Sequence, residues 1–329
     1  MKPFSLFFYE WLYGERGYYA NFPEIGKSGD FFTAVSVTPL FGGAIANHIY
    51  RRIKRGELNP KATIFEVGAH RGYLLADIVQ FLYTFEPDLI NSLSFAIVEP
   101  FESLRAVQKE YFQSSFGDRV KLRHFKDFSE VECEEGFVVA NEIFDAFPCE
   151  LIYKEQMGYV EDFKIIWGEM DEDIMRIANR YGQTKGEVAR GYERFAMKMA
   201  EAFGTCEFVT FDYGDLEVRN DFSIRVYTKH RVYPLFDEAL DIKQAFGRSD
   251  ITYDVNFSHL IDAFEDAGWQ KSAYKTQMVA LVDFGIMELL EKIMEVKGFE
   301  LYKRELEKVK VLINPSMMGE RFKMVSFIK

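Results

Sequence analysis

The amino-acid sequence predicts an α/β fold in which helices cover both faces of a Rossmann-like, mostly parallel sheet. From residue 62 onward, apolar strand-like segments alternate with segments of helical periodicity, which is the pattern of such a sheet. The 329 residues are 48% hydrophobic and include 33 phenylalanines, enough for a large core. Strands are expected at 62–67, 93–99, 119–125, 136–141 and 206–212, with helices between them at 72–86 and 101–114.

The part before the sheet, residues 1–60, is expected to be an N-terminal helical and lid segment. Residues 4–20 have the pattern of a short amphipathic helix followed by a tyrosine-rich turn, and residues 21–36 that of a loop. A second helix is expected to begin at Pro39, with Thr38 as its N-cap.

The sheet core is expected to be interrupted by an insertion. Residues 61–149 and 205–329 are assigned to the core, and residues 150–204 to an insertion on the substrate side. The insertion has a hairpin pattern around Met157-Gly158 and then helical periodicity, with a glycine-rich interruption at 182–191. The elements expected after it are a strand near 224–228, a helix at 257–267, a strand near 270–276, helices across 278–312 and a strand at 322–328.

The composition narrows the class of protein. A formal net charge of −12 disfavours DNA or RNA as a substrate, because nucleic-acid-binding proteins usually carry a basic surface. The three cysteines and five histidines form no metal-binding spacing, so we expect no metal site and a reducing compartment. No apolar run is long enough to span a bilayer, and the N-terminus lacks the pattern of a signal or transit peptide. We therefore expect a cytoplasmic protein, or a mitochondrial matrix protein if the source is eukaryotic.

A strand, a glycine turn and a helix follow one another at the start of the sheet. The turn lies between Gly68 and Gly72 and includes Ala69, and it places backbone N–H groups and a helix N-terminus around a ligand. The carboxylate of Glu66 would repel a phosphate but attract a cation or a pair of hydroxyls. S-adenosylmethionine offers both, with its sulfonium, its ammonium and its ribose diol. The alternative is a plain strand–helix unit that binds no ligand.

The second strand ends in Glu99-Pro100, where Rossmann-like sheets hydrogen-bond a ribose diol. Glu99 follows Gly68 by 31 residues rather than the usual spacing of about 20. The longer first helix explains this difference. An ordinary surface glutamate is the alternative.

The fourth strand runs into Asn141-Glu142, with Asp145 three residues later. A helical turn over 142–146 would put Glu142 and Asp145 on one face, where both could meet a nucleophile. Asn141 could contact the cofactor, or it could simply cap the next helix.

Two further segments carry candidate binding residues. Asp127 and Phe128 follow the third strand, where a carboxylate could accept the adenine amino group. Gly29, Asp30 and Thr33 belong to a loop with two aromatic residues, which could form a lid or an ordinary turn.

Taken together, segments in the same order along most of the chain resemble the MidA family of methyltransferases, which are linked to assembly of respiratory complex I. These segments are Trp11-Leu-Tyr, Gly17-Tyr-Tyr19, Gly29-Asp-Phe-Phe-Thr33, Pro39-Leu-Phe-Gly42, Glu66-Val-Gly-Ala69 with Gly72, Ala140-Asn-Glu-Ile-Phe-Asp-Ala146 with Pro148, Asp212-Tyr-Gly214, Asp250-Ile-Thr252, Val255-Asn-Phe257 and Met318-Gly-Glu-Arg-Phe-Lys323. The chain differs from the family in the cofactor loop, where Gly68-Ala-His-Arg-Gly72 replaces the usual Gly-Ala-Gly-Ser-Gly.

The resemblance implies a seven-strand methyltransferase sheet with an added hairpin and helical region. It also implies methyl transfer from S-adenosylmethionine to an arginine side chain of a protein, a complex I subunit being the known type of substrate. The residues that would bind the cofactor are Glu66, Gly68, Ala69 and Gly72 at the methionine end, Glu99 and Pro100 at the ribose, Asp127 and Phe128 at the adenine, Asn141, and the covering residues Gly29, Asp30 and Thr33.

Glu142 and Asp145 are the predicted catalytic residues. A guanidinium is protonated at neutral pH, so an arginine nucleophile needs carboxylates that orient it and accept charge. The main alternative is an assembly factor that binds S-adenosylmethionine with little or no turnover. A nicotinamide dehydrogenase would need Gly-x-Gly-x-x-Gly, which the loop does not have, and the acidic balance argues against a nucleic-acid methyltransferase. A homodimer is possible, but the sequence does not fix the oligomeric state.

Overall fold

The computed structural model describes residues 1–21, 33–228 and 231–329. They form two compact units, each assembled from separate parts of the chain. The first unit contains the described residues of Met1–Phe31, Ile143–Met197 and Tyr213–Ala267. The second contains those of Phe32–Glu142, Lys198–Asp212 and Gly268–Lys329. The three-part division expected from the sequence stays a prediction.

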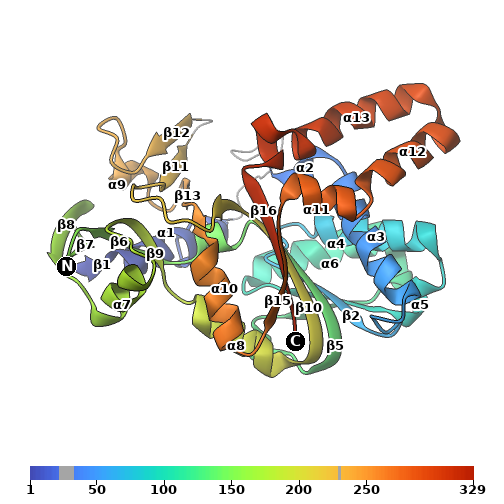
Figure 1. Ribbon diagram of the computed structural model, residues 1–329, viewed down its shortest axis with the longest axis horizontal. Coiled ribbons are helices and arrows are strands. Elements are labelled where there is room, and N and C mark those ends of the chain that lie inside the picture. The colour runs from blue at the N-terminus through green and yellow to red at the C-terminus, as the bar shows by residue number, and fades with distance from the viewer. Residues whose placement is uncertain (22–32, 229–230) are drawn as a thin grey trace. The chain divides into compact units, whose positions relative to one another are not determined.

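The second unit is built on the predicted α/β sheet (Figure 1). The strand order is β15-β16-β10-β5-β2-β3-β4, and the pairs from β10 to β4 are parallel. Short β14 (Val255–Asn256) pairs with the last two residues of β10, Gly214 and Asp215, which like β14 belong to the first unit, so the sheet has eight strands rather than seven. The other bounds are β2 Thr63–Val67, β3 Ser94–Val98, β4 Leu122–Phe125, β5 Cys133–Asn141, β10 Phe203–Asp215, β15 Gln270–Thr276 and β16 Phe322–Ile328.

The register of the central strands brings their carboxyl ends level. Val67 of β2 lies opposite Val98 of β3 on one side and Ala140 of β5 on the other. All five residues of β2 are buried, as expected for a strand covered on both faces. The residues that follow these three positions therefore meet at one edge of the sheet.

Helices of the second unit pack closely where glycines remove side chains. An ideal Cβ on Gly42 of α3 (Leu40–Lys54) would lie 2.7 Å from the Cβ of Asp77 on α4 (Tyr73–Phe85). Helix α3 begins at Leu40, so Pro39 occupies the N-cap position predicted for Thr38. The remaining helices of this unit are α2 Ala34–Val37, α5 Leu89–Ser92, α6 Glu102–Phe116, α11 Gln277–Asp283, α12 Ile286–Lys297 and α13 Phe299–Ile313.

The first unit contains two antiparallel sheets and several helices. One sheet has the order β1-β7-β6-β9, with β8 paired to β7, and the other the order β12-β11-β13. The strands are β1 Lys2–Pro3, β6 Cys149–Tyr153, β7 Gln156–Glu161, β8 Lys164–Glu169, β9 Lys185–Ala189, β11 Arg225–Thr228, β12 Arg231–Pro234 and β13 Asp250–Thr252. The helices are α1 Phe4–Tyr13, α7 Glu172–Arg180, α9 Ile242–Ala245 and α10 Phe257–Asp266, while α8 Tyr192–Ala202 begins here and continues into the second unit.

One expectation for the insertion was wrong. Met157-Gly158 lies inside β7 rather than in a turn. The turns lie on either side, where Lys154 and Asp162 have positive φ values of 57° and 48°. The glycine-rich interruption expected at 182–191 does separate α7 from α8. It contains a strand that was not expected, β9, because long-range pairing with β6 overrides the weak local preference of a short glycine-containing strand.

Candidate cofactor and active site

Gly68, Glu99 and Asn141 lie at the aligned ends of β2, β3 and β5 in the second unit. Ligands of open α/β sheets bind at this carboxyl edge. The structure therefore brings together three of the segments that the sequence predicted to bind a cofactor.

The loop after β2 has a conformation that favours glycine. Its φ angles are 66° at Gly68, 46° at His70 and 79° at Gly72. The N–H of Gly68 donates to the carbonyl of Val98 at 3.2 Å, and that of Gly72 to the carbonyl of Ala69 at 2.6 Å. His70 therefore adopts the left-handed backbone that glycine would supply at this position, at a modest cost in conformational energy.

Glu66 is 4% exposed at the end of β2. Its Oε2 accepts a hydrogen bond of 2.9 Å from the N–H of Leu75, in the first turn of α4. Burial raises the pKa of the Glu66 carboxyl to about 8, since a buried charge loses its hydration. This carboxyl thus satisfies a free donor at the start of α4. Its predicted contact with the methionine end of the cofactor stays a prediction.

Glu99 is 3% exposed and lies beside the loop. Its Oε1 accepts a 3.1 Å hydrogen bond from the N–H of Phe101. Burial raises the pKa of the Glu99 carboxyl to about 7, although the bonds it accepts lower it. The carbonyls of Glu99 and Pro100 both accept hydrogen bonds of 2.8 Å from Nη1 of Arg105, which fixes the backbone here.

Asn141, the last residue of β5, has a buried acceptor atom that the described residues leave without a hydrogen bond. Its Oδ1 is buried and accepts no hydrogen bond from any residue that the structure describes. Its Nδ2 donates to Oε1 of Glu142 at 2.9 Å. A buried oxygen of this kind is costly unless a ligand or water satisfies it, so it fits a ligand that carries N–H or O–H groups.

Glu142 has a φ of 54°, and its N–H donates to the carbonyl of Phe211 at 2.8 Å. The predicted helical turn over 142–146 begins only at Phe144, so Glu142 is not part of a helical turn with Asp145. Asp145 belongs to the first unit and is 3% exposed. Burial raises the pKa of the Asp145 carboxyl to about 7, while a hydrogen bond from Tyr213 opposes that rise.

The predicted adenine residues already have protein partners. Both carboxylate oxygens of Asp127 lie 2.7 Å from Nζ of Lys198, and Oδ1 also accepts a bond from the N–H of Ser129. Phe128 is buried, with its ring 6.0 Å from that of Phe203. If Asp127 accepts the adenine amino group, it must share its carboxylate with Lys198.

Of the three residues of the predicted lid, the structure describes Thr33. Gly29 and Asp30 lie outside the described residues. Thr33 directly precedes α2, and its carbonyl accepts bonds from both the N–H and the hydroxyl of Ser36.

Sequence reasoning missed Gln108 of α6, which is fully buried beside the loop. Its Nε2 donates to the carbonyl of His70 at 2.8 Å. A signal was present, because Gln108 occurs in the apolar stripe between Leu104 and Phe112, where a polar residue needs a partner.

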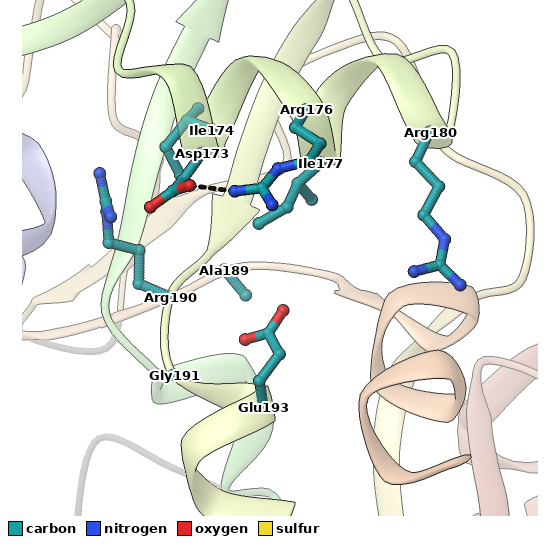
Figure 2. Close-up of a pocket in the computed structure, with 9 residues that line it drawn as sticks. All are labelled: Asp173, Ile174, Arg176, Ile177, Arg180, Ala189, Arg190, Gly191 and Glu193. Atoms are coloured by element: carbon teal, nitrogen blue, oxygen red, sulfur yellow. Dashed lines mark hydrogen bonds and ion pairs between the residues drawn. The ribbon is translucent and has the colours of Figure 1, made fainter. Parts of the chain in front are cut away.

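A pocket of about 370 Å³ lies in the first unit, between α7 and the junction of β9 with α8 (Figure 2). Its charged side chains already have partners within the chain, so we assign it no ligand. The ion pairs join Arg176 with Asp173, Arg180 with Asp262, Arg190 with Glu150, and His259 with Glu193.

Comparison with known proteins decides the class. Residues 44–275 match the family model described as "Putative S-adenosyl-L-methionine-dependent methyltransferase". The chain belongs to this methyltransferase family. Its cofactor is therefore S-adenosylmethionine, and the resemblance seen in the sequence is confirmed.

Relatives and solved structures agree with this assignment. The mitochondrial protein arginine methyltransferase NDUFAF7 of Homo sapiens is 24% identical over 345 residues, covering 93% of this chain and 75% of that protein. That of Rattus norvegicus is 23% identical over 343 residues, covering 93% and 76%. A Burkholderia thailandensis protein crystallised with S-adenosyl-homocysteine has a TM-score of 0.82 at 24% identity, covering 99% of this chain and 87% of that one, and shows the shared fold.

The strand-end residues of the methyltransferase fit S-adenosylmethionine. Oδ1 of Asn141 is a buried acceptor, and the cofactor's ammonium and amino groups are donors. Glu99 presents a buried carboxyl, and the cofactor's ribose hydroxyls are donors. Within residues 1–21, 33–228 and 231–329, every helix is too short or too polar to cross a lipid bilayer.

Proposed function

We propose that this methyltransferase transfers a methyl group to arginine side chains of another protein. The observation that carries the proposal is the pair Asn141–Glu142 at the end of β5, where an amide orients a carboxylate beside the cofactor loop. A carboxylate is the group that binds a guanidinium with two parallel hydrogen bonds. The names of the human and rat relatives, both protein arginine methyltransferases, support the same substrate class.

In this proposal, the cofactor is held along the carboxyl edge of the sheet. Backbone groups of Gly68, Ala69 and Gly72 approach the methionine end, with Glu66 behind them. Glu99 accepts hydrogen bonds from the ribose hydroxyls, with Pro100 shaping the turn, and Asn141 accepts one from a cofactor N–H group. Asp127 and Phe128 frame the adenine, and Gly29, Asp30 and Thr33 cover the cofactor.

The proposed chemistry asks the protein mainly for alignment. When bound, the cofactor would supply a methyl group on a sulfonium, and its sulfur would depart as a neutral thioether. Positioning of the nucleophile in line with the carbon–sulfur bond lowers the barrier to such a displacement by roughly 7–11 kcal/mol. Glu142 binds the guanidinium and takes the N–H proton that leaves as the new N–C bond forms. Asp145, the second carboxylate that the sequence predicted, keeps that proposed role; burial raises its pKa to about 7.

The physiological partner and compartment belong to the proposal as well. We propose a complex I type subunit, or a similar protein, as the substrate. The names of the human and rat relatives say that those proteins are mitochondrial. For this chain, the cytoplasm, or the mitochondrial matrix of a eukaryote, stays the prediction.

The test compares Glu142→Gln with Glu134→Gln, an exposed glutamate at the other end of the same strand. The probes are a library of arginine-containing peptides and S-adenosylmethionine labelled in its methyl group. We expect label on arginine with the parent and with Glu134→Gln, and at least about a hundredfold less with Glu142→Gln. Binding of S-adenosyl-homocysteine should be equal in all three. Full activity of Glu142→Gln, or label on lysine instead of arginine, would refute the proposal.

A further inference from the structure

In the second unit, one buried side-chain amide links the glycine loop after β2 to Glu99 at the end of β3. The side chain of Gln108, on α6, is fully buried. Its Nε2 lies 2.8 Å from the carbonyl oxygen of His70 in the glycine loop and 3.4 Å from Oε2 of Glu99 at the end of β3. Its Oε1 lies 3.0 Å from Nε2 of His124 on β4.

These contacts leave one orientation for the amide. An amide NH₂ has two donors, and here it faces two acceptors, a carbonyl and a carboxyl oxygen. Turning the amide over would place Oε1 against both acceptors. It would also place the NH₂ group against His124, whose Nε2 would then have to accept. The orientation of Gln108 is therefore set by three independent segments of the chain.

His124 fixes the third contact. Burial, together with the nearby charges of Arg105 and Lys109, lowers the pKa of its imidazole to about 4. The ring is therefore neutral at physiological pH. Because Oε1 of Gln108 only accepts, the ring proton lies on Nε2 and donates to it.

We infer that Gln108 is a positioning residue that joins the glycine loop to Glu99 and thereby sets how strongly the ribose hydroxyls of the cofactor are recognised. The inference rests on the proposed role of Glu99 as the ribose acceptor. Gln108 donates to one Glu99 oxygen, and the N–H of Phe101 donates to the other, so the plane of this carboxyl is fixed before a ligand arrives. A group held in this way loses little conformational entropy on binding.

The amide of Gln108 also holds the glycine loop at His70, the position where a residue other than glycine has a left-handed backbone. His70 has a φ of 46°, and the Gln108 bond is made to its carbonyl. A Cβ on Gly72 would lie 3.6 Å from Cγ of Gln108 and 3.2 Å from the ring of Phe112. Gln108 thus lies against the loop at His70 and Gly72. Its loss should release the loop and the Glu99 carboxyl together.

The experiment measures dissociation constants by calorimetry for S-adenosyl-homocysteine and for its 2′-deoxy analogue. The variants are Gln108→Leu, Gln108→Met and the control Gln113→Leu, an exposed glutamine on the same helix. We expect Gln108→Leu to weaken S-adenosyl-homocysteine about 10- to 100-fold, the size of effect typical of groups that orient a binding residue. It should also reduce the preference for the ribose ligand over its deoxy analogue at least about threefold. The control should change neither quantity.

The two proposals fail in different ways. If Glu99→Gln keeps the full preference for the ribose ligand, the proposed role of Glu99 is wrong. If Glu99→Gln loses that preference while both Gln108 variants keep it, the inference about Gln108 is overturned. A general loss of affinity with the preference intact would also overturn it, because that is the result of loosened packing alone. Gln108→Met keeps the length of the side chain, so it provides the comparison if Gln108→Leu does not fold.

Discussion

Glu66→Gln should make the free energy of unfolding less sensitive to pH. Burial raises the pKa of the Glu66 carboxyl from 4.5 to about 8, and the nearby charges of Asp77 and Glu99 add to the rise. Between these two values the folded state holds a proton that the unfolded state has already released. The contribution of Glu66 to the free energy of unfolding therefore falls as pH rises through this window, by about 1.4 kcal/mol per pH unit. A glutamine cannot ionise, so the variant lacks this loss.

The magnitude follows from the width of the window. From about pH 5 to about pH 7.5, the parent should lose about 3 kcal/mol of stability that Glu66→Gln retains. The amide oxygen of the glutamine can still accept the N–H of Leu75, so the helix start is kept. Any effect of the new NH₂ group on the stability of the variant that does not depend on pH cancels, because we compare the stability difference between variant and parent at one pH with the same difference at the other.

The assay is urea unfolding followed by circular dichroism at both pH values. Glu110→Gln, at an exposed position of α6, is the matched control and should track the parent. A stability difference between Glu66→Gln and the parent that stays constant with pH would refute the reasoning, because Glu66 would then be ionised in the folded state. A separate titration of Glu66→Gln with S-adenosyl-homocysteine tests the predicted cofactor contact. If Glu66 only supports α4, the variant should bind this ligand as tightly as the parent.

Two further predictions concern the site and its support. If the ribose hydroxyls donate to the ionised form of Glu99 as proposed, binding of S-adenosyl-homocysteine should weaken as pH falls below about 7, by up to roughly tenfold per unit, because burial raises the pKa of Glu99 to about 7. Calorimetry across this range should show the slope for the parent and none for Glu99→Gln; equal slopes would contradict it. Gly42→Val should cost about 1–3 kcal/mol in urea unfolding, because its Cβ would lie 2.7 Å from the Cβ of Asp77, and an unchanged midpoint would show that α3 can shift away from α4.

The sequence predicted the central strands well because their signal is local. Segments such as 63–67 and 94–98 are short apolar runs with a glycine or a carboxylate directly after them, and parallel pairing brings their ends level. The positions of Gly68 and Glu99 at one edge follow from that pairing. Strand β9 was missed because Lys185–Ala189 has little strand character of its own and is defined by its pairing with β6.

Contacts between distant side chains were harder to predict. Nothing near Asp127 in the sequence indicates that Lys198, 71 positions later, binds both of its carboxylate oxygens. The role of Gln108 likewise depends on helix α6 placing an amide between a loop and a strand end. Asp145 follows Glu142 by three residues, yet the backbone at Glu142 has a positive φ, which the helical spacing of the sequence does not reveal.

The last strand of the chain occupies an inner position of the sheet. β16 lies between β10 and β15, and beyond its end Cys206 and Lys329 still exchange both of their backbone hydrogen bonds, at 3.3 and 2.9 Å. Because a ribosome makes the chain from its N-terminus, the sheet cannot close until Phe322–Ile328 has been made. A nascent or truncated chain that ends before Phe322 leaves β10 and β15 with open edges, which invite pairing with other chains. Synthesis of β16 is therefore the event that protects the edges of β10 and β15 from pairing with other chains.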